Sequence, residues 1–211
     1  MQAKSWTFVK KEKWGEGPWQ HEPDKMQFAD PETGLPCLIH RGPAGQLCGY
    51  VGITEGHKFF GIKYSDCSLP EAKPRGPRPG DGEPTQIGDR TLPPMPERIV
   101  KMMQERKQCN EDGHCSHCPE AMLDVHGGIT FSEFCLEMRA DGHGICHVAD
   151  PGEPEKVWWF GFDCAHLGDL CPAYGDLLGG RKSVMREGDY RDVAYVQQEI
   201  AQLAKQLKAL A

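Results

Sequence analysis

The sequence predicts an α+β fold: a mostly antiparallel sheet packed by a C-terminal amphipathic helix, with long loops between the elements. Three observations support this class. Two apolar runs flank a turn at residues 42–45, an aromatic run occupies 156–164, and apolar residues at helical spacing follow within 189–211. Glycine and proline, 25 and 17 of the 211 residues, are frequent enough to favour turns and loops over long regular elements.

The first 36 residues are expected to form an irregular N-terminal arm. They contain three of the five tryptophans and show no sustained period of two or 3.6. Residues 37–211 are predicted to form a single α+β domain. It begins with a β-hairpin, because the apolar run from Cys37 and the run Leu47–Ile53 are separated by Gly-Pro-Ala-Gly.

A long loop is expected at residues 68–96, which hold eight of the seventeen prolines and four glycines. Such a composition buries too little apolar surface to offset the entropy lost on ordering. Pro96 is well placed as the first residue of a helix that continues over 97–108. Two further strands are predicted at 121–131 and 156–164, where apolar and aromatic residues gather.

The C-terminal helix is predicted to begin after an N-cap at Asp189. Its apolar residues recur at spacings of three and four, so they form one stripe along the helix: Val193, Val196, Ile200, Leu203, Leu207 and Leu210. This stripe could pack against the sheet. It could equally form a coiled-coil seam between two copies of the chain, which would make the protein a homodimer through this helix.

Charge and hydropathy exclude several classes of partner. Lys and Arg total 24 against 31 Asp and Glu, and this net charge of -7 disfavours binding to nucleic acid or to anionic lipid. No apolar run approaches the roughly 20 residues of a membrane span, and residues 1–13 lack the apolar stretch of a secretory signal. A cytoplasmic protein is therefore expected. Its ten cysteines should stay reduced and serve as metal ligands, catalytic groups or buried side chains.

The first candidate site follows the aromatic strand. Asp163, His166 and Asp169 are spaced three apart, so a turn-like exit from the strand would bring them to one side. Carboxylate and imidazole together suit a divalent metal such as zinc, manganese or iron, with Asp163 and His166 as candidate ligands. One carboxylate could instead orient His166 as a general base. A third alternative is a turn whose aspartates only cap backbone amides.

The second candidate site contains His126, followed by Gly127 and Gly128 in a strand-like run. Glycine lacks a Cβ and tolerates positive φ, so a ligand or another backbone can approach closely there. His126 is therefore predicted to face a cleft, with the two glycines at the substrate. The alternative is a bulge with a hydrogen-bonded histidine.

The two motifs are compatible with one pocket, in which His126, Asp163, His166 and Asp169 would be the catalytic group. Tyr50 is a further candidate for substrate contact, within the glycine-rich run at 49–57. The same run ends on His57, a second such candidate. A tight transition from strand to loop explains these glycines equally well.

A structural zinc site is suggested by Cys109, Cys115 and Cys118, where the last two form a C-x-x-C pair. The fourth ligand would be a nearby histidine or a later cysteine: His114, His117, Cys135 or Cys146. Free reduced thiols and a redox pair are the alternatives. Divalent metal, with zinc as the first choice, is thus the cofactor that the sequence suggests.

Several common enzyme classes lack their motifs in this sequence. It contains no G-x-x-x-x-G-K-[ST] loop, no G-x-G-x-x-G after a strand, no G-x-S-x-G elbow and no H-E-x-x-H. Nucleotide kinases of the phosphate-loop type, dinucleotide oxidoreductases, serine hydrolases and zincins are therefore disfavoured.

Four blocks of residues stand out along the chain: Gly49-Tyr-Val-Gly52 with Glu55-Gly-His57, Asp124-Val-His-Gly-Gly-Ile-Thr130, Trp159-Phe-Gly-Phe-Asp-Cys-Ala-His-Leu-Gly-Asp169 and Tyr190-Arg191. Together they resemble a family of uncharacterised phage and prophage proteins. The resemblance extends from about Cys48 to the C-terminal helix. It implies a phage origin and a setting in the host cytoplasm, and it implies no particular reaction.

Three functional hypotheses follow. The first is a metal-dependent hydrolase or nucleotide-processing enzyme that acts on a small molecule, with the metal activating water. The second is a non-catalytic binding protein that engages a host protein or a small nucleotide, in which the His and Asp turns only brace loops. The third is a virion or assembly component that associates through its final helix.

Overall fold

The computed structural model describes residues 1–69, 72–77, 81–84, 86–87, 90–91, 93–108, 116–135, 144–174 and 188–211. The chain divides into two compact units. The first consists of residues 1–64 and 123–211, and the second of residues 65–122.

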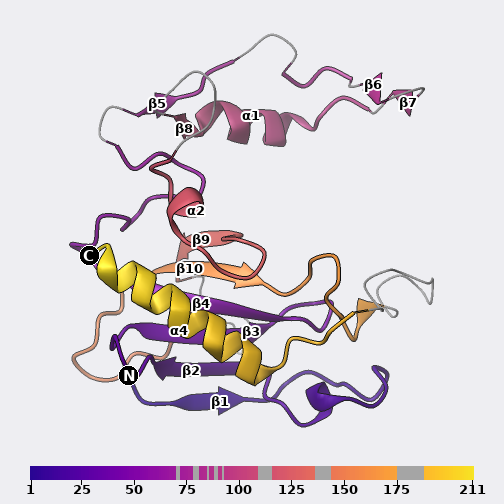
Figure 1. The fold of residues 1–211 in the computed structure, drawn as a ribbon, viewed down its shortest axis with the longest axis vertical. Coiled ribbons are helices and arrows are strands. Elements are labelled where there is room, and N and C mark those ends of the chain that lie inside the picture. Colours follow the sequence, from indigo (N-terminus) through magenta and orange to yellow (C-terminus); the bar gives the residue numbers. More distant parts are fainter. Residues whose placement is uncertain are drawn as a thin grey trace. The chain divides into compact units, whose positions relative to one another are not determined.

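The first unit contains a six-stranded antiparallel sheet (Figure 1). Its strands, in spatial order, are β1 (Lys4–Trp6), β2 (Lys25–Ala29), β3 (Pro36–Arg41), β4 (Leu47–Ile53), β10 (Trp158–Asp163) and β9 (Phe131–Phe134). The predicted hairpin is β3 and β4, and the predicted aromatic strand is β10. With one long helix against this sheet, the α+β class is confirmed.

The predicted N-terminal arm is more regular than its sequence suggests. It supplies β1 and β2 to the edge of the sheet and a short 3-10 helix, η1 (Pro18–Gln20). The sequence of β2 lacks the alternation of apolar and polar residues that marks a strand, because the polar residues Lys25 and Gln27 are buried, each only 1% exposed. The Lys25 ammonium donates to the carbonyl of Gly144, and the Gln27 amide to the carbonyl of Val148, so these polar side chains occupy inward positions.

The helix α4 (Val193–Ala209) crosses one face of the sheet, over β3 and β4 (Figure 1). Its stripe of Val196, Ile200, Leu203 and Leu207 is fully buried. Gly49 lets the helix approach, because a Cβ there would lie 2.5 Å from Phe162 and 2.9 Å from Ile200. The stripe thus packs on the sheet and is not exposed for a seam between two copies. The N-cap is Asp192, which accepts from the amide of Tyr195 at 2.8 Å, and not Asp189 as predicted.

The opposite face of the sheet carries a second apolar layer. Side chains alternate along each strand, so this face receives Leu38, Cys48, Tyr50 and Trp159, with Val157 packed beside them. The predicted strand at 121–131 is wrong: the helix α2 (Pro119–Met122) ends there, a loop follows, and only Phe131 belongs to β9. Gly127 and Gly128 have φ of 66° and 84°, values that a strand does not allow.

The second unit has short elements and a small core. Its elements are β5 (Lys73–Pro74) with β8 (Lys107–Gln108), β6 (Gln86–Ile87) with β7 (Arg90–Thr91), α1 (Glu97–Glu105) and α2. Cys67 and Cys118 are buried together, with Leu69 and Ala72 against them. The sequence predicts a long loop at 68–96. In the described part of this range, the strands β5, β6 and β7 are each only two residues long. The predicted helix ends at Glu105, three residues early.

Within the ranges given above, no helix is long and apolar enough to cross a membrane.

Candidate functional site

The start of α4 is held in place by a charged side chain from the N-terminal segment. One oxygen of Glu22 accepts from the amide of Val193 at 2.9 Å. The other contacts the Arg41 guanidinium at 3.1 Å and accepts from the Tyr190 hydroxyl. A segment about 170 residues away therefore positions the residues that open α4.

Asp169 is the centre of the first candidate site, and it is 1% exposed. Its Oδ2 lies 2.8 Å from Nε2 of His126 and accepts from the backbone amide of His166 at 3.0 Å. Its Oδ1 accepts from Nε of Arg191 at 2.9 Å. Burial alone would raise the pKa of Asp169, but the hydrogen bonds from His126, Arg191 and the His166 amide outweigh it and lower the pKa.

Backbone pairing explains why Arg191 reaches this carboxylate. Asp169 forms a parallel bridge with Asp189: the amide of Asp189 donates to Gly168, and the amide of Leu170 donates to Asp189. A Cβ at Gly188 would lie 2.2 Å from the carbonyl oxygen of Gly168, so only glycine allows this approach.

His126 is fixed on three sides. Its Nδ1 lies 2.9 Å from the Tyr195 hydroxyl, and its backbone amide donates to Glu199 at 2.8 Å. The same loop is tied further along α4, where Gln206 exchanges two hydrogen bonds with the backbone of Asp124. Both ring nitrogens of His126 are thus engaged inside the protein.

His166 completes the group. Its ring lies 5.4 Å from that of His126, and its Nδ1 lies 3.7 Å from Oδ2 of Asp169. This Nδ1 is buried, and within the described part of the chain it has no hydrogen-bond partner. Gly127 makes room for the ring, since a Cβ there would lie 2.0 Å from Cε1 of His166.

Of the four side chains predicted to converge, the structure brings together His126, His166 and Asp169, whose potential ligand atoms all lie within 4.8 Å of one another. Asp163 is not in this group. It pairs with Cys48 in the strand register, so alternation directs it to the face opposite α4. Its carboxylate accepts from the Thr130 hydroxyl at 2.9 Å and from the amide of Ala165 at 3.1 Å, as a turn cap does.

The residues predicted to touch substrate have structural contacts instead. Tyr50 is 6% exposed and packs edge-on against Phe131. His57 donates from Nε2 to the carbonyl of Leu207 at 2.8 Å and accepts from the amide of Phe59. Gly127 borders His166. No atom lies within 4 Å of a Cβ built at Gly128, so open space remains beside it.

Only one of the three cysteines of the zinc site expected from the sequence lies within the described residues. Cys109 and Cys115 lie outside the described residues, and Cys118 is buried beside Cys67. Cys135 and Cys146, considered above as distant ligands, instead form a second group with His147.

In this second group, Sγ of Cys135 lies 3.6 Å from Nδ1 of His147 and accepts from the indole N–H of Trp159 at 3.4 Å. The Cys146 thiol donates to the carbonyl of His147 at 3.5 Å. Its interaction with Cys135 lowers the pKa of Cys135 and raises that of Cys146. The part of the chain that is described therefore contains two groups of side chains that could hold a metal ion.

Sequence reasoning missed three members of the first site: Arg191, Tyr195 and Glu199. Tyr195 and Glu199 are spaced four apart and share one face of α4, so this polar pair beside an apolar stripe was a signal for both. Arg191 precedes the N-cap Asp192 and has no such pattern. By its sequence, the polar turn at Cys146-His147 could contribute a ligand to either candidate site, but no local pattern pairs His147 with Cys135, which is twelve residues away.

Comparisons of this chain with family models, with curated proteins and with solved structures find no match.

Proposed function

We propose that His126, His166 and Asp169 bind one divalent metal ion, and that the protein is a metal-dependent hydrolase with an anionic substrate. The observation that carries this proposal is the buried Nδ1 of His166. It has no hydrogen-bond partner among the described residues, and it lies 3.7 Å from the carboxylate oxygen that His126 also contacts. A cation between these atoms would satisfy all three.

The ligand separations support this site. Ligands bonded to one zinc ion at about 2.0–2.2 Å lie roughly 3–3.5 Å from one another. The two separations given for Oδ2 of Asp169 are 2.8 Å to His126 and 3.7 Å to His166, so they bracket that range. Small side-chain movements would bring all three atoms to bonding distance.

Outer contacts of the kind that support metal ligands are present. The Tyr195 hydroxyl engages the second ring nitrogen of His126, and Arg191 holds the second oxygen of Asp169. Such partners fix the orientation of the ligands. Three protein ligands also leave coordination positions for water, whose pKa a bound metal lowers from about 15.7 toward 7.

Arg191 favours hydrolysis of an anionic substrate. Two histidines and one carboxylate serve both hydrolytic zinc enzymes and iron(II) oxygenases. The Arg191 side chain is 27% exposed beside the proposed metal, so it could contact a phosphate or carboxylate group. The His166 side chain is 34% exposed, which leaves the metal open to substrate on that side.

A metal-free acid–base site is the second candidate. The Asp169 carboxylate would accept the Nε2 proton of His126, and Nδ1 would then accept from Tyr195. Burial raises the pKa of Tyr195, so its hydroxyl keeps the proton needed for this arrangement. His126 would then act as a base through Tyr195, whose hydroxyl would pass its proton to Nδ1 as it takes one from the substrate, in place of a metal-bound water.

The test uses untagged protein, Zn²⁺ and Mn²⁺, and two chromogenic phosphate esters, p-nitrophenyl phosphate and bis-p-nitrophenyl phosphate. We expect His166→Ala to lose one equivalent of metal in calorimetric titration and to lose ester hydrolysis. Its unfolding free energy should stay within about 1 kcal/mol of the parent, because the ring is partly exposed. His21→Gln, at an exposed histidine, is the matched control and should behave as the parent.

Three outcomes count against the proposal. Unchanged metal binding in both His126→Ala and His166→Ala would overturn the metal site. Hydrolysis that resists chelators but is lost in His126→Ala would support the metal-free alternative. Metal binding without hydrolysis of either ester, or with consumption of dioxygen by the Fe²⁺ form, would overturn the hydrolase and leave a binding protein or an oxygenase.

A further inference from the structure

The second cluster lies on the face of the sheet opposite α4. Cys135 directly follows β9, and Cys146 and His147 belong to the segment that leads back toward β10. Cys135 packs against the apolar layer that contains Trp159. The three side chains therefore come from two segments that the sheet brings together, and none of them belongs to the His126 site.

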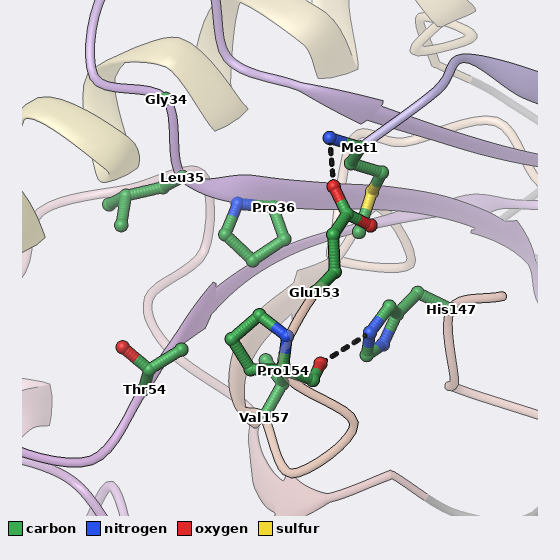
Figure 2. A pocket seen from close by; sticks show the side chains of 9 residues that line it. All are labelled: Met1, Gly34, Leu35, Pro36, Thr54, His147, Glu153, Pro154 and Val157. Atoms are coloured by element: carbon green, nitrogen blue, oxygen red, sulfur yellow. Dashed lines mark hydrogen bonds and ion pairs between the residues drawn. The ribbon is translucent and has the colours of Figure 1, made fainter. Parts of the chain in front are cut away.

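The orientation of His147 suits a metal ligand. Its Nε2 lies 3.0 Å from the carbonyl oxygen of Pro154, and because a carbonyl only accepts, Nε2 carries the proton (Figure 2). Nδ1 faces Sγ of Cys135 at 3.6 Å, so it is the ring nitrogen that could share a metal ion with the sulfur. Histidines that bind metal commonly donate their other N–H to a backbone carbonyl in this way.

Polar groups surround the sulfur of Cys135, which would bind metal as the thiolate. Trp159 donates its indole N–H to Cys135 at 3.4 Å. The buried ammonium of Lys25 donates to the carbonyl of Gly144, two residues before Cys146, and forms no ion pair with a carboxylate of the described chain. Burial lowers the pKa of Lys25, and the neighbouring sulfurs of Cys146 and Cys135 oppose this shift.

Two other buried cysteines, Cys37 and Cys171, differ from those of this cluster. Burial raises the pKa of the Cys37 thiol to about 12 and that of Cys171 to about 11. Neither belongs to a group of potential metal ligands within the ranges searched. Cys37 donates to the carbonyl of Leu35, as a packed thiol does. Burial of small apolar side chains therefore does not explain the cluster at Cys135.

We propose that Cys135, Cys146 and His147 form a second metal site, selective for zinc and similar thiophilic ions. Two thiolates and one imidazole are soft enough to prefer zinc over magnesium or calcium. Binding displaces the proton of the Cys146 thiol to solvent. The bound ion clips the segment at 144–147 to the end of β9, so its first role is structural.

His147 connects this cluster to a surface hollow of about 220 Å3. Figure 2 shows its ring at the edge of that hollow, directed toward Pro154, with the ion pair between the Met1 ammonium and Glu153 close by. Solvent can thus approach one side of the cluster. The metal should exchange with chelators in the folded protein.

Cobalt distinguishes this site from the His126 site. Co²⁺ bound to thiolate shows sulfur-to-metal charge-transfer absorption in the near ultraviolet, which nitrogen and oxygen ligands do not produce. We expect reduced protein to develop this band with one equivalent of Co²⁺ and to lose it when Zn²⁺ is added. Cys146→Ser, at a half-buried position, should bind Zn²⁺ at least about 100-fold more weakly, beyond the 10–100-fold typical of outer partners.

Two variants serve as controls. Cys37→Ala removes a buried thiol outside the cluster and should keep the band. His166→Ala should also keep it, so failure of the first metal site and failure of this one give different results. His147→Gln provides a second variant of the cluster, should Cys146→Ser fold poorly, and should lose Zn²⁺ affinity in the same way.

Two results would overturn the proposal. The first is a Co²⁺ titration of reduced protein without a charge-transfer band. The second is a disulfide between Cys135 and Cys146, detected by mass as the loss of two hydrogens, that persists in reductant and excludes Zn²⁺. That result would make the pair a structural or redox disulfide.

Discussion

Gly127 and Gly128 are adjacent and both have left-handed backbones, but only Gly127 has a neighbour close to the position of a Cβ. They form a matched pair. Alanine at either position should reduce the free energy of unfolding by about 1–2 kcal/mol, through backbone strain. Gly127→Ala should in addition displace the His166 ring and weaken Zn²⁺ binding about 10-fold or more, as seen in calorimetric titration.

Equal Zn²⁺ affinity in the two glycine variants would contradict the proposed role of His166 as a ligand. Equal loss of affinity would point to the loop as a whole. Urea denaturation of both variants provides the stability comparison.

Asp24 makes the stability depend on pH. It is fully buried and accepts from the amides of Phe8 and Val9, with Lys11 at 2.7 Å and Arg41 at 2.8 Å. Burial would raise its pKa, but the hydrogen bond from Lys11 and the two amides outweigh this and lower it. Its contribution is therefore present above the unfolded pKa of about 3.9 and is lost as pH falls through the lower folded pKa.

We expect Asp24→Asn to lose about 3–5 kcal/mol at pH 7, because two buried cations lose their partner. The variant should also lose less stability than the parent between pH 4 and pH 2. Urea titrations across this range provide the measurement, with the exposed Glu12→Gln as control. A parallel acid profile in Asp24→Asn and the parent would show that other carboxylates govern the acid response.

At the scale of elements, α4 depends on its buried stripe. Leu203 is 0% exposed against the sheet, and Gln202 beside it is exposed. Leu203→Ala should cost about 2–5 kcal/mol in unfolding free energy. Gln202→Ala should change it by less than about 0.5 kcal/mol. Chemical denaturation separates the two, and a small effect at Leu203 would mean that the helix is loosely packed.

The elements that the sequence predicts well carry a continuous apolar run or a helical stripe. β4 and β10 are buried at nearly every residue, and α4 buries one stripe. β2 was missed because Lys25 and Gln27 occupy inward positions, satisfied by carbonyls more than 110 residues away. The strand expected at 121–131 failed at its two glycines, which need positive φ.

The sequence predicts some contacts of the candidate site and not others. The spacing of His166 and Asp169 correctly brings them together in a turn. Asp163 lies on the other face because strand alternation continues to its position, and this could be foreseen only with the end of β10 known. The contact with His126 depends on a loop docked on α4, which no local pattern reveals.

At the scale of the whole molecule, the two units differ in how much they bury. The helix α1 has no buried residue, and the Met102 side chain is 65% exposed. A nine-residue helix without packing is marginal in water. Backbone amides of α1 should therefore exchange with solvent at least about 100-fold faster than those around Ile200 in α4, as hydrogen-exchange mass spectrometry can measure. Comparable protection would show that α1 has a covering partner in solution.

The covering of the sheet by α4 has a consequence for biosynthesis. The ribosome adds residues 193–209 after every strand of the sheet, including Val51 and Phe160, which face the helix. Until then the nascent chain presents a bare apolar surface, to which chaperones or other unfinished chains can attach. Translation that stops before Val193 should therefore give an aggregating product, even though all six strands have been made.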